Sequence, residues 1–126
     1  MRTIKFRLWD KDFNEYSAYH LNRLLVIDIN DTNRFIAEQF TGLCDKNGKE
    51  IYEGDILDLG QTVNGCNLFT VEWSNERLGW TVRYTSIMNN PRTYEYDITS
   101  FFKIDVNTGE GVEVIGNIHE NKELLK

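Results

Sequence analysis

The stretch from Gln39 to Leu57, which reads QFTGLCDKNGKEIYEGDIL, constrains the fold more than any other part of the chain. Asn47-Gly48 lies between two segments that contain apolar residues. Both residue types tolerate the positive φ that a tight two-residue hairpin turn requires. We therefore expect a hairpin in which Phe40–Leu43 is the first strand and Glu50–Tyr52 is the second.

A second turn signal follows closely in the same stretch. Gly54-Asp55 precedes the apolar pair Ile56-Leu57, which is expected to begin another strand. The stretch is thus predicted to fold three short strands back on one another.

The rest of the chain also favours strands, because apolar residues alternate with polar ones or form short runs between turn residues. The expected connections are a turn at Asp10–Asp12, exposed loops at Gly60–Asn67 and Ser86–Arg92, and a turn at Asn107–Gly111. Asn121 is expected to cap a short helical tail, Lys122–Lys126. The further strands predicted are Ile4–Trp9, Phe13–Tyr19, Leu24–Ile29, Arg34–Phe40, Leu68–Trp73, Gly79–Tyr84, Tyr94–Ile98, Phe101–Val106 and Val112–Ile118.

Composition supports a β-dominated domain and narrows the range of functions that the protein can have. The 126 residues fit one compact domain, and sixteen aromatic residues favour strands. The net charge is −6, and all of the acidic excess lies in residues 41–126. Because Lys and Arg contacts to phosphate dominate nucleic-acid affinity, an acidic chain is a poor candidate for binding nucleic acid. No apolar run is long enough for a membrane span or a signal peptide, so we expect a soluble cytoplasmic protein.

The residues that carry catalysis or bind metals form no recognisable motif. Cys44 and Cys66 lack C-x-x-C spacing, so neither a zinc site nor a disulfide framework is indicated, and we expect small, partly buried thiols. His20 and His119 are expected at the surface or at strand ends. The glycines form neither a phosphate loop nor a dinucleotide fingerprint. We therefore expect no catalytic residues, no metal and no cofactor.

A cluster of carboxylates and a cluster of rings are the candidate sites. Glu53, Asp55 and Asp58 could hold a divalent cation, but we expect a solvated turn rim instead. An aromatic and basic face could bind an extended peptide or stack on single-stranded nucleic acid. The competing interpretation, which we favour, places most of its rings in the core, because strand periodicity points them inward. The residues of this face are Trp73, Arg77, Trp80, Arg83 and Tyr84.

Several phrases together resemble the YopX-like family of bacteriophage and prophage proteins, and they span the chain. The central and closing phrases are the most specific. Cys44, His119 and Lys122 depart from the residues usual in that family. The phrases are IKFRLWD from Ile4, QFTGL from Gln39, DKNGKEIYEGDI from Asp45, VEW from Val71 with GW from Gly79, and EVIGNI from Glu113 with EN from Glu120.

The resemblance implies a mainly β (β-rich α+β) fold: an N-terminal β-hairpin portion, residues 1–48, and a C-terminal SH3-type small barrel, residues 49–126. It also implies a phage origin and a location in the host cytoplasm. It carries over no catalytic residue.

The function expected from these observations is a noncatalytic interaction or assembly module with an unidentified protein partner, and exposed strands offer it a route to a homo-oligomer. The first alternative is a nucleic-acid-binding accessory protein. The second is a hydrolase with an unrecognised site, which would require His20 or His119 to meet carboxylates in a cleft.

Overall fold

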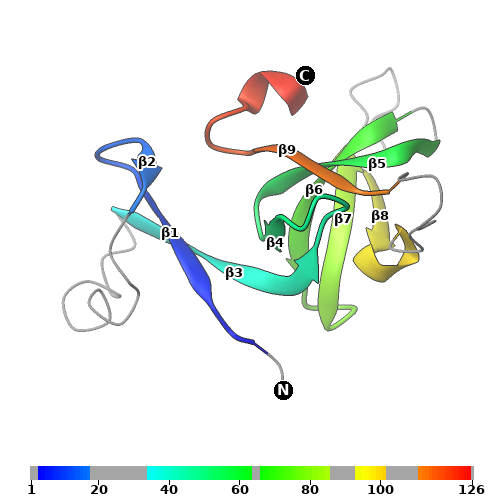
Figure 1. Ribbon diagram of the computed structural model, residues 1–126, viewed down its shortest axis with the longest axis horizontal. Coiled ribbons are helices and arrows are strands. Elements are labelled where there is room, and N and C mark those ends of the chain that lie inside the picture. The colour runs from blue at the N-terminus through cyan, green and yellow to red at the C-terminus, as the bar shows by residue number, and fades with distance from the viewer. Residues whose placement is uncertain (1–2, 18–33, 64–65, 86–92, 102–110, 126) are drawn as a thin grey trace.

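The computed structural model of the protein describes residues 3–17, 34–63, 66–85, 93–101 and 111–125. Within these residues the fold consists of two antiparallel sheets, a four-stranded one in the order β2-β1-β3-β4 and a five-stranded one in the order β8-β7-β6-β5-β9 (Figure 1). The strands are β1 (Phe6–Asp10), β2 (Glu15–Tyr16), β3 (Phe35–Cys44), β4 (Glu50–Tyr52), β5 (Asp55–Val63), β6 (Cys66–Ser74), β7 (Gly79–Thr85), β8 (Thr93–Asp97) and β9 (Glu113–Asn117).

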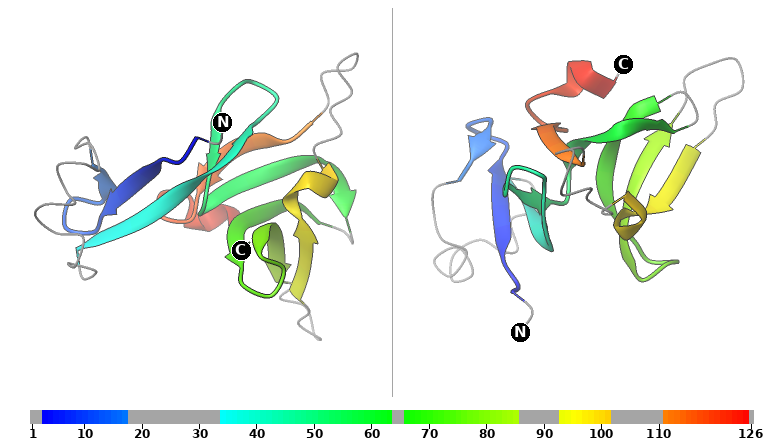
Figure 2. Two further views of the ribbon diagram at one scale, coloured as in Figure 1. Left: turned by 90° about the horizontal axis from the view of Figure 1, so that it is seen from below. Right: turned by 45° about the vertical axis from the view of Figure 1, so that its right-hand side comes forward.

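The five-stranded sheet curves into a half-barrel, and β1 and β2 extend away from it (Figures 1 and 2). The mainly β class is therefore confirmed. The described helices are two short 3-10 turns, η1 (Ile98–Phe101) and η2 (Lys122–Leu125), so the α+β part of the expectation is wrong for these residues. Asn121 does not cap an α-helix with its side chain, because its Oδ1 accepts the backbone N–H of Asn117 at 3.1 Å.

The central hairpin is confirmed, with a different turn from the one expected. β3 pairs with β4 through Phe40↔Tyr52 and Cys44↔Glu50. Gly48 has a φ of +82°, but Asn47 is not among the residues with positive φ. The turn from Asp45 to Lys49 is longer than a two-residue turn, and its geometry needs only the one glycine.

The third strand of the central stretch, β5, does not pair with this hairpin. β5 begins at Asp55 as expected, yet it pairs with β6 and β9 rather than with β4. The expectation that the three strands fold back on one another is therefore wrong. The chain changes sheets at Glu53-Gly54, where Gly54 has a φ of +85°.

Two other predicted segments are corrected. The expected loop at Gly60–Asn67 is largely strand, because β5 runs to Val63 and β6 starts at Cys66, and these two residues pair. The Asn64-Gly65 dipeptide between them is a hairpin signal that the loop prediction left out of account. At the N-terminus the strand begins at Phe6, and Ile4 is 63% exposed rather than half-buried.

The predicted β6–β7 hairpin is confirmed, with Trp73 opposite Trp80 and Val71 opposite Val82. The Tyr94–Ile98 and Val112–Ile118 predictions correspond to β8 and β9. The strand that follows β1 is shorter than the predicted strand Phe13–Tyr19, because β2 contains only Glu15 and Tyr16. The strand at Leu24–Ile29, the loop at Ser86–Arg92, most of Phe101–Val106 and most of the turn at Asn107–Gly111 lie outside the described residues.

The core lies inside the half-barrel, and the central hairpin closes its open side. Ile51 of β4 has no exposed surface and packs among residues of the half-barrel, and Leu43 of β3 packs against the same cluster. The buried half-barrel members of the cluster are Leu57, Leu59, Phe69, Val71, Val82, Ile98, Val112 and Val114.

The Asp45 side chain fixes this hairpin against the half-barrel. Its Oδ1 accepts the backbone N–H groups of Asn47 and Lys49, each at 2.9 Å, and its Oδ2 accepts the N–H of Val114 in β9 at 2.9 Å. Asp45 is only 5% exposed, so water does not replace these bonds readily. One carboxylate thus organises a turn and holds β9 beside it.

We predict that Asp45→Ala lowers the free energy of unfolding by about 3 kcal/mol, because three N–H groups lose a charged acceptor. Urea unfolding followed by circular dichroism measures the loss. The control is Glu76→Ala at an exposed position of the β6–β7 turn, which should change stability by less than about 0.5 kcal/mol. Equal losses in the two variants would contradict the role given to Asp45.

Candidate functional site

The most concentrated group of polar side chains lies where the two sheets meet, around Glu38 of β3. Glu38 is 2% exposed, and its carboxylate contacts three donors. Arg7 Nε lies 3.0 Å and the Tyr16 hydroxyl 2.9 Å from Oε1, and His119 Nε2 lies 3.1 Å from Oε2. The donors come from β1, from β2 and from the turn after β9. We call these four residues the Glu38 junction.

Arg7 links the Glu38 junction to the first residue of the half-barrel. Its Nη2 donates to Asp55 Oδ1 at 2.8 Å, and Asp55 Oδ2 also accepts the backbone N–H of Tyr52 at 2.8 Å. The guanidinium lies over the rings of Tyr16 and Tyr52, 4.4 and 4.8 Å from their centroids. Burial raises the pKa of Asp55, and the Arg7 charge opposes that shift.

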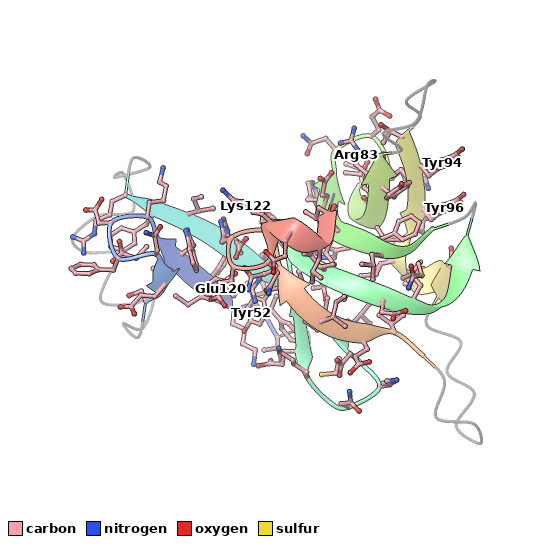
Figure 3. All side chains as sticks on the ribbon, turned by 90° about the horizontal axis from the view of Figure 1, so that it is seen from above. Tyr52, Arg83, Tyr94, Tyr96, Glu120 and Lys122 are labelled. Atoms are coloured by element: carbon pink, nitrogen blue, oxygen red, sulfur yellow. The ribbon has the colours of Figure 1, made fainter. Side chains whose placement is uncertain are left out.

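His119 is held in place by its neighbours on both sides. Its ring stacks on Trp9 with the centroids 4.5 Å apart. Asn117 Oδ1 accepts the backbone N–H groups of His119 and Glu120, at 3.0 and 2.9 Å, which fixes the turn after β9. Tyr52 and Glu120 both lie near this meeting point of the sheets (Figure 3). His119 thus follows the end of a strand, as expected, but its side chain is only 12% exposed, and its pairing with Glu38 was not predicted.

Gly54 is required at the junction for two reasons. Its φ of +85° is unfavourable for other residues, and a Cβ built there would lie 2.2 Å from Glu38 Oε2. The turn between β4 and β5 therefore passes directly against the buried carboxylate. The expected solvated rim is wrong for Asp55, which is 1% exposed, while Glu53 and Asp58 are partly buried.

The Glu38 junction is a buried polar network in which three donors occupy most of the roughly four acceptor sites of one carboxylate. Burial raises the pKa of the Tyr16 hydroxyl, which keeps it protonated as a donor to Glu38. A general base needs a free lone pair facing a substrate, whereas both Glu38 oxygens already accept hydrogen bonds. The hydrolase alternative required a histidine that meets a carboxylate, and His119 does so. Its partners in the described chain include no serine or cysteine nucleophile. His20 lies outside the described residues.

The structure separates the residues of the predicted aromatic and basic face. Trp73 and Trp80 pack edge to face with centroids 5.2 Å apart, and the Tyr84 ring lies 5.8 Å from that of Phe69 in the core. Period-two alternation places Arg83 on the opposite side of β7, away from these rings. Figure 3 shows Arg83 on the half-barrel, away from the Glu38 junction.

Both arginines of the predicted face are paired with carboxylates. Arg83 Nη1 lies 3.2 Å from Glu72 Oε2. Arg77 Nη1 lies 3.3 Å from Asp97 Oδ1, and its Nε lies 4.0 Å from Glu95 Oε1. Their charges are therefore balanced locally, which weakens the case for a phosphate-binding surface.

A groove of about 340 Å³ separates the end of β3 from the half-barrel. Trp80 and Arg77 of the predicted face both contribute to it, and no sequence pattern indicated that β3 supplies the other wall. The lining includes Thr41, Leu43, Arg77, Trp80, Asp97 and Ile98. Among buried side-chain nitrogen and oxygen atoms in the described residues, Trp80 Nε1 is the one without a hydrogen-bond partner.

The tip of the β6–β7 hairpin borders this groove and exposes apolar side chains. Leu78 is 78% exposed and Trp73 is 44% exposed. Leu78 also has a φ of +53°, an unfavourable conformation for a leucine. Neither the exposure nor the strained backbone of Leu78 was predicted.

The described residues hold no group of three or more His, Cys, Asp or Glu side chains arranged to bind a metal ion. None of the helices described is long and apolar enough to cross a membrane. Cys44 is a free, exposed thiol rather than a partly buried one; the side chain of Cys66 lies outside the described part.

Comparisons with known proteins agree with this fold. The sequence model of the family described as YopX protein matches residues 5–126. The crystal structure of protein EF1440 from Enterococcus faecalis is similar with a TM-score of 0.60 at 21% sequence identity, and the match covers 100% of each chain. At this identity the likeness shows the fold alone. No curated protein matches the sequence.

We predict that Gly54→Ala lowers the free energy of unfolding by about 3 kcal/mol, because the methyl group meets Glu38 and the backbone is strained. Gly48→Ala is a matched control, since Gly48 has a φ of +82° and no atom within 4 Å of the position that a Cβ would take. The control should lose only about 1 kcal/mol, from backbone strain alone. Urea unfolding of both variants gives the comparison, and equal losses would show that Glu38 does not restrict this position.

Proposed function

The chain belongs to the YopX family over residues 5–126, and on that premise we propose that it is a noncatalytic interaction module, encoded by a phage or prophage, that binds another protein in the host cytoplasm. The observation that carries this proposal is the tip of the β6–β7 hairpin, where Leu78 is 78% exposed and strained.

The β6–β7 turn places Leu78 in the left-handed region, and the exposed side chain gains little in return. A non-glycine residue in the left-handed region costs about 1–2 kcal/mol. Leu78 recovers little of that cost by packing, because most of its surface faces solvent. Strained residues of this kind cluster at functional sites, and Trp is enriched among the residues that dominate protein interfaces. A partner that covers Leu78 and Trp73 would supply the missing burial.

The form of the half-barrel also supports a binding role. Its first strand, β5, pairs with both β6 and the last strand, β9, while β6, β7 and β8 follow one another. This order is consistent with an SH3-type small barrel in residues 49–126, and barrels of that type can bind extended peptides beside aromatic residues. The groove beside Trp80 likewise has an aromatic residue in its lining, and it lies between the half-barrel and β3.

A noncatalytic role is supported by the burial and pairing of the Glu38 junction. The Tyr16 phenol and the His119 imidazole both hydrogen-bond to the Glu38 carboxylate, so these ionisable groups are engaged with one another. The pairing of Arg77 and Arg83 with carboxylates favours a protein partner over a nucleic acid.

We predict that Leu78→Asn raises the free energy of unfolding by about 1 kcal/mol, because asparagine adopts a positive φ more readily than leucine does. Urea unfolding measures the gain. Phe13→Asn is the control: Phe13 is 67% exposed in the turn after β1, and its φ is not positive. That control should show no such gain, and a Leu78→Asn variant less stable than the native chain would contradict the strain argument.

We further predict that Leu78→Asn weakens partner binding although it stabilises the fold. The native chain, Leu78→Asn and Phe13→Asn are each immobilised and exposed to nuclease-treated lysate of prophage-carrying cells. Recovery of the bound protein should fall about tenfold for Leu78→Asn, as the loss of about 1.4 kcal/mol of binding energy predicts, and should stay unchanged for Phe13→Asn. Equal recovery by all three, or capture that disappears with nuclease, would contradict the proposal.

A further inference from the structure

The groove beside the hairpin tip has apolar walls contributed by both sheets. Leu43 of β3 faces Trp80 of β7 and Ile98 of η1 across a space of about 340 Å³. A small-molecule site usually buries most of its ligand, roughly 70–90% of the ligand surface. This groove is open to solvent, so it suits a side chain presented by a larger molecule.

The charged residues that line the groove are Arg77 and Asp97, and Glu95 lies beside Arg77. Arg77 is shared between Asp97, at 3.3 Å, and Glu95, at 4.0 Å, so two carboxylates surround one guanidinium. The Asp97 side chain is 59% exposed and can contact a second cation. A basic residue on the ligand would complement this carboxylate, whereas an acidic one would be repelled.

We propose that this groove binds an extended segment of a partner protein in which an aliphatic side chain precedes a lysine or arginine. The aliphatic group packs between Leu43 and Trp80, and the cation contacts Asp97. This inference rests on the proposed function, since it names the chemistry of the partner at the same end of the molecule.

The test uses the full chain and a set of short synthetic peptides of equal length. One has a central Leu-Val-Leu followed by a lysine pair, a second replaces the lysines by glutamates, and a third keeps the lysines but replaces the aliphatic residues by serines. Proton–nitrogen correlation spectra follow the indole N–H signals of the three tryptophans during titration. Trp80→Phe identifies the Trp80 signal by its disappearance.

The lysine peptide should shift the Trp80 signal and bind about fivefold more tightly than the glutamate peptide in low salt, and the difference should shrink as salt is added. The serine peptide should bind at least about fivefold more weakly than the lysine peptide, because it lacks an apolar anchor. Asp97→Asn should reduce the lysine preference to less than about twofold. Glu15→Gln, on β2 outside the groove, should leave the preference unchanged.

Equal affinity for the charged peptides, a preference for glutamate, or no shift of the Trp80 signal would overturn the inference. A single-stranded oligonucleotide that displaces the lysine peptide would overturn it as well. If these results occur while Leu78→Asn still abolishes capture, the proposed function stands and only the peptide chemistry fails. A lysine preference together with unchanged capture by Leu78→Asn would instead refute the hairpin tip as the contact surface.

Discussion

The burial of the Glu38 carboxylate is the constraint on which the rest of the structure depends. A buried charge must be paired and hydrogen-bonded, and removal of its partners would leave it at a cost of several kcal/mol. The donors that satisfy Glu38 are Arg7 and Tyr16 from the first strands and His119 from near the end of the chain. Satisfying this one group therefore brings the beginning, middle and end of the chain together.

The central hairpin then joins the Glu38 junction to the hydrophobic core. One part of β3 pairs with β1 around Glu38, and its end pairs with β4, whose Ile51 enters the half-barrel. The Asp45 carboxylate accepts hydrogen bonds both from the turn between these strands and from β9. Gly54 lets the chain pass against Glu38 into β5. The two sheets are consequently coupled by polar contacts on one side of the hairpin and by apolar packing on the other.

This arrangement leaves the reactive groups inside and the apolar contact groups outside. The ionisable side chains of the Glu38 junction contact one another and connect β1, β2, β3 and the turn after β9. The β6–β7 hairpin instead exposes Leu78 and Trp73 beside a groove whose Trp80 N–H has no acceptor in the described chain. The buried polar network and the exposed apolar side chains thus lie in different parts of the molecule.

The sequence by itself determined the strands and most of their turns. Period-two alternation and the Asn47-Gly48 and Gly54-Asp55 signals act over a few residues, so they located the central hairpin and indicated the mainly β class. Only the tertiary structure decided which sheet β5 joins and that Asp55 is buried. It also brought His119 to Glu38 and made β3 one wall of the groove. Those outcomes depend on contacts between residues far apart in the chain, such as Arg7 with Asp55 and Glu38 with His119, and local patterns of polarity carry no information about such partners.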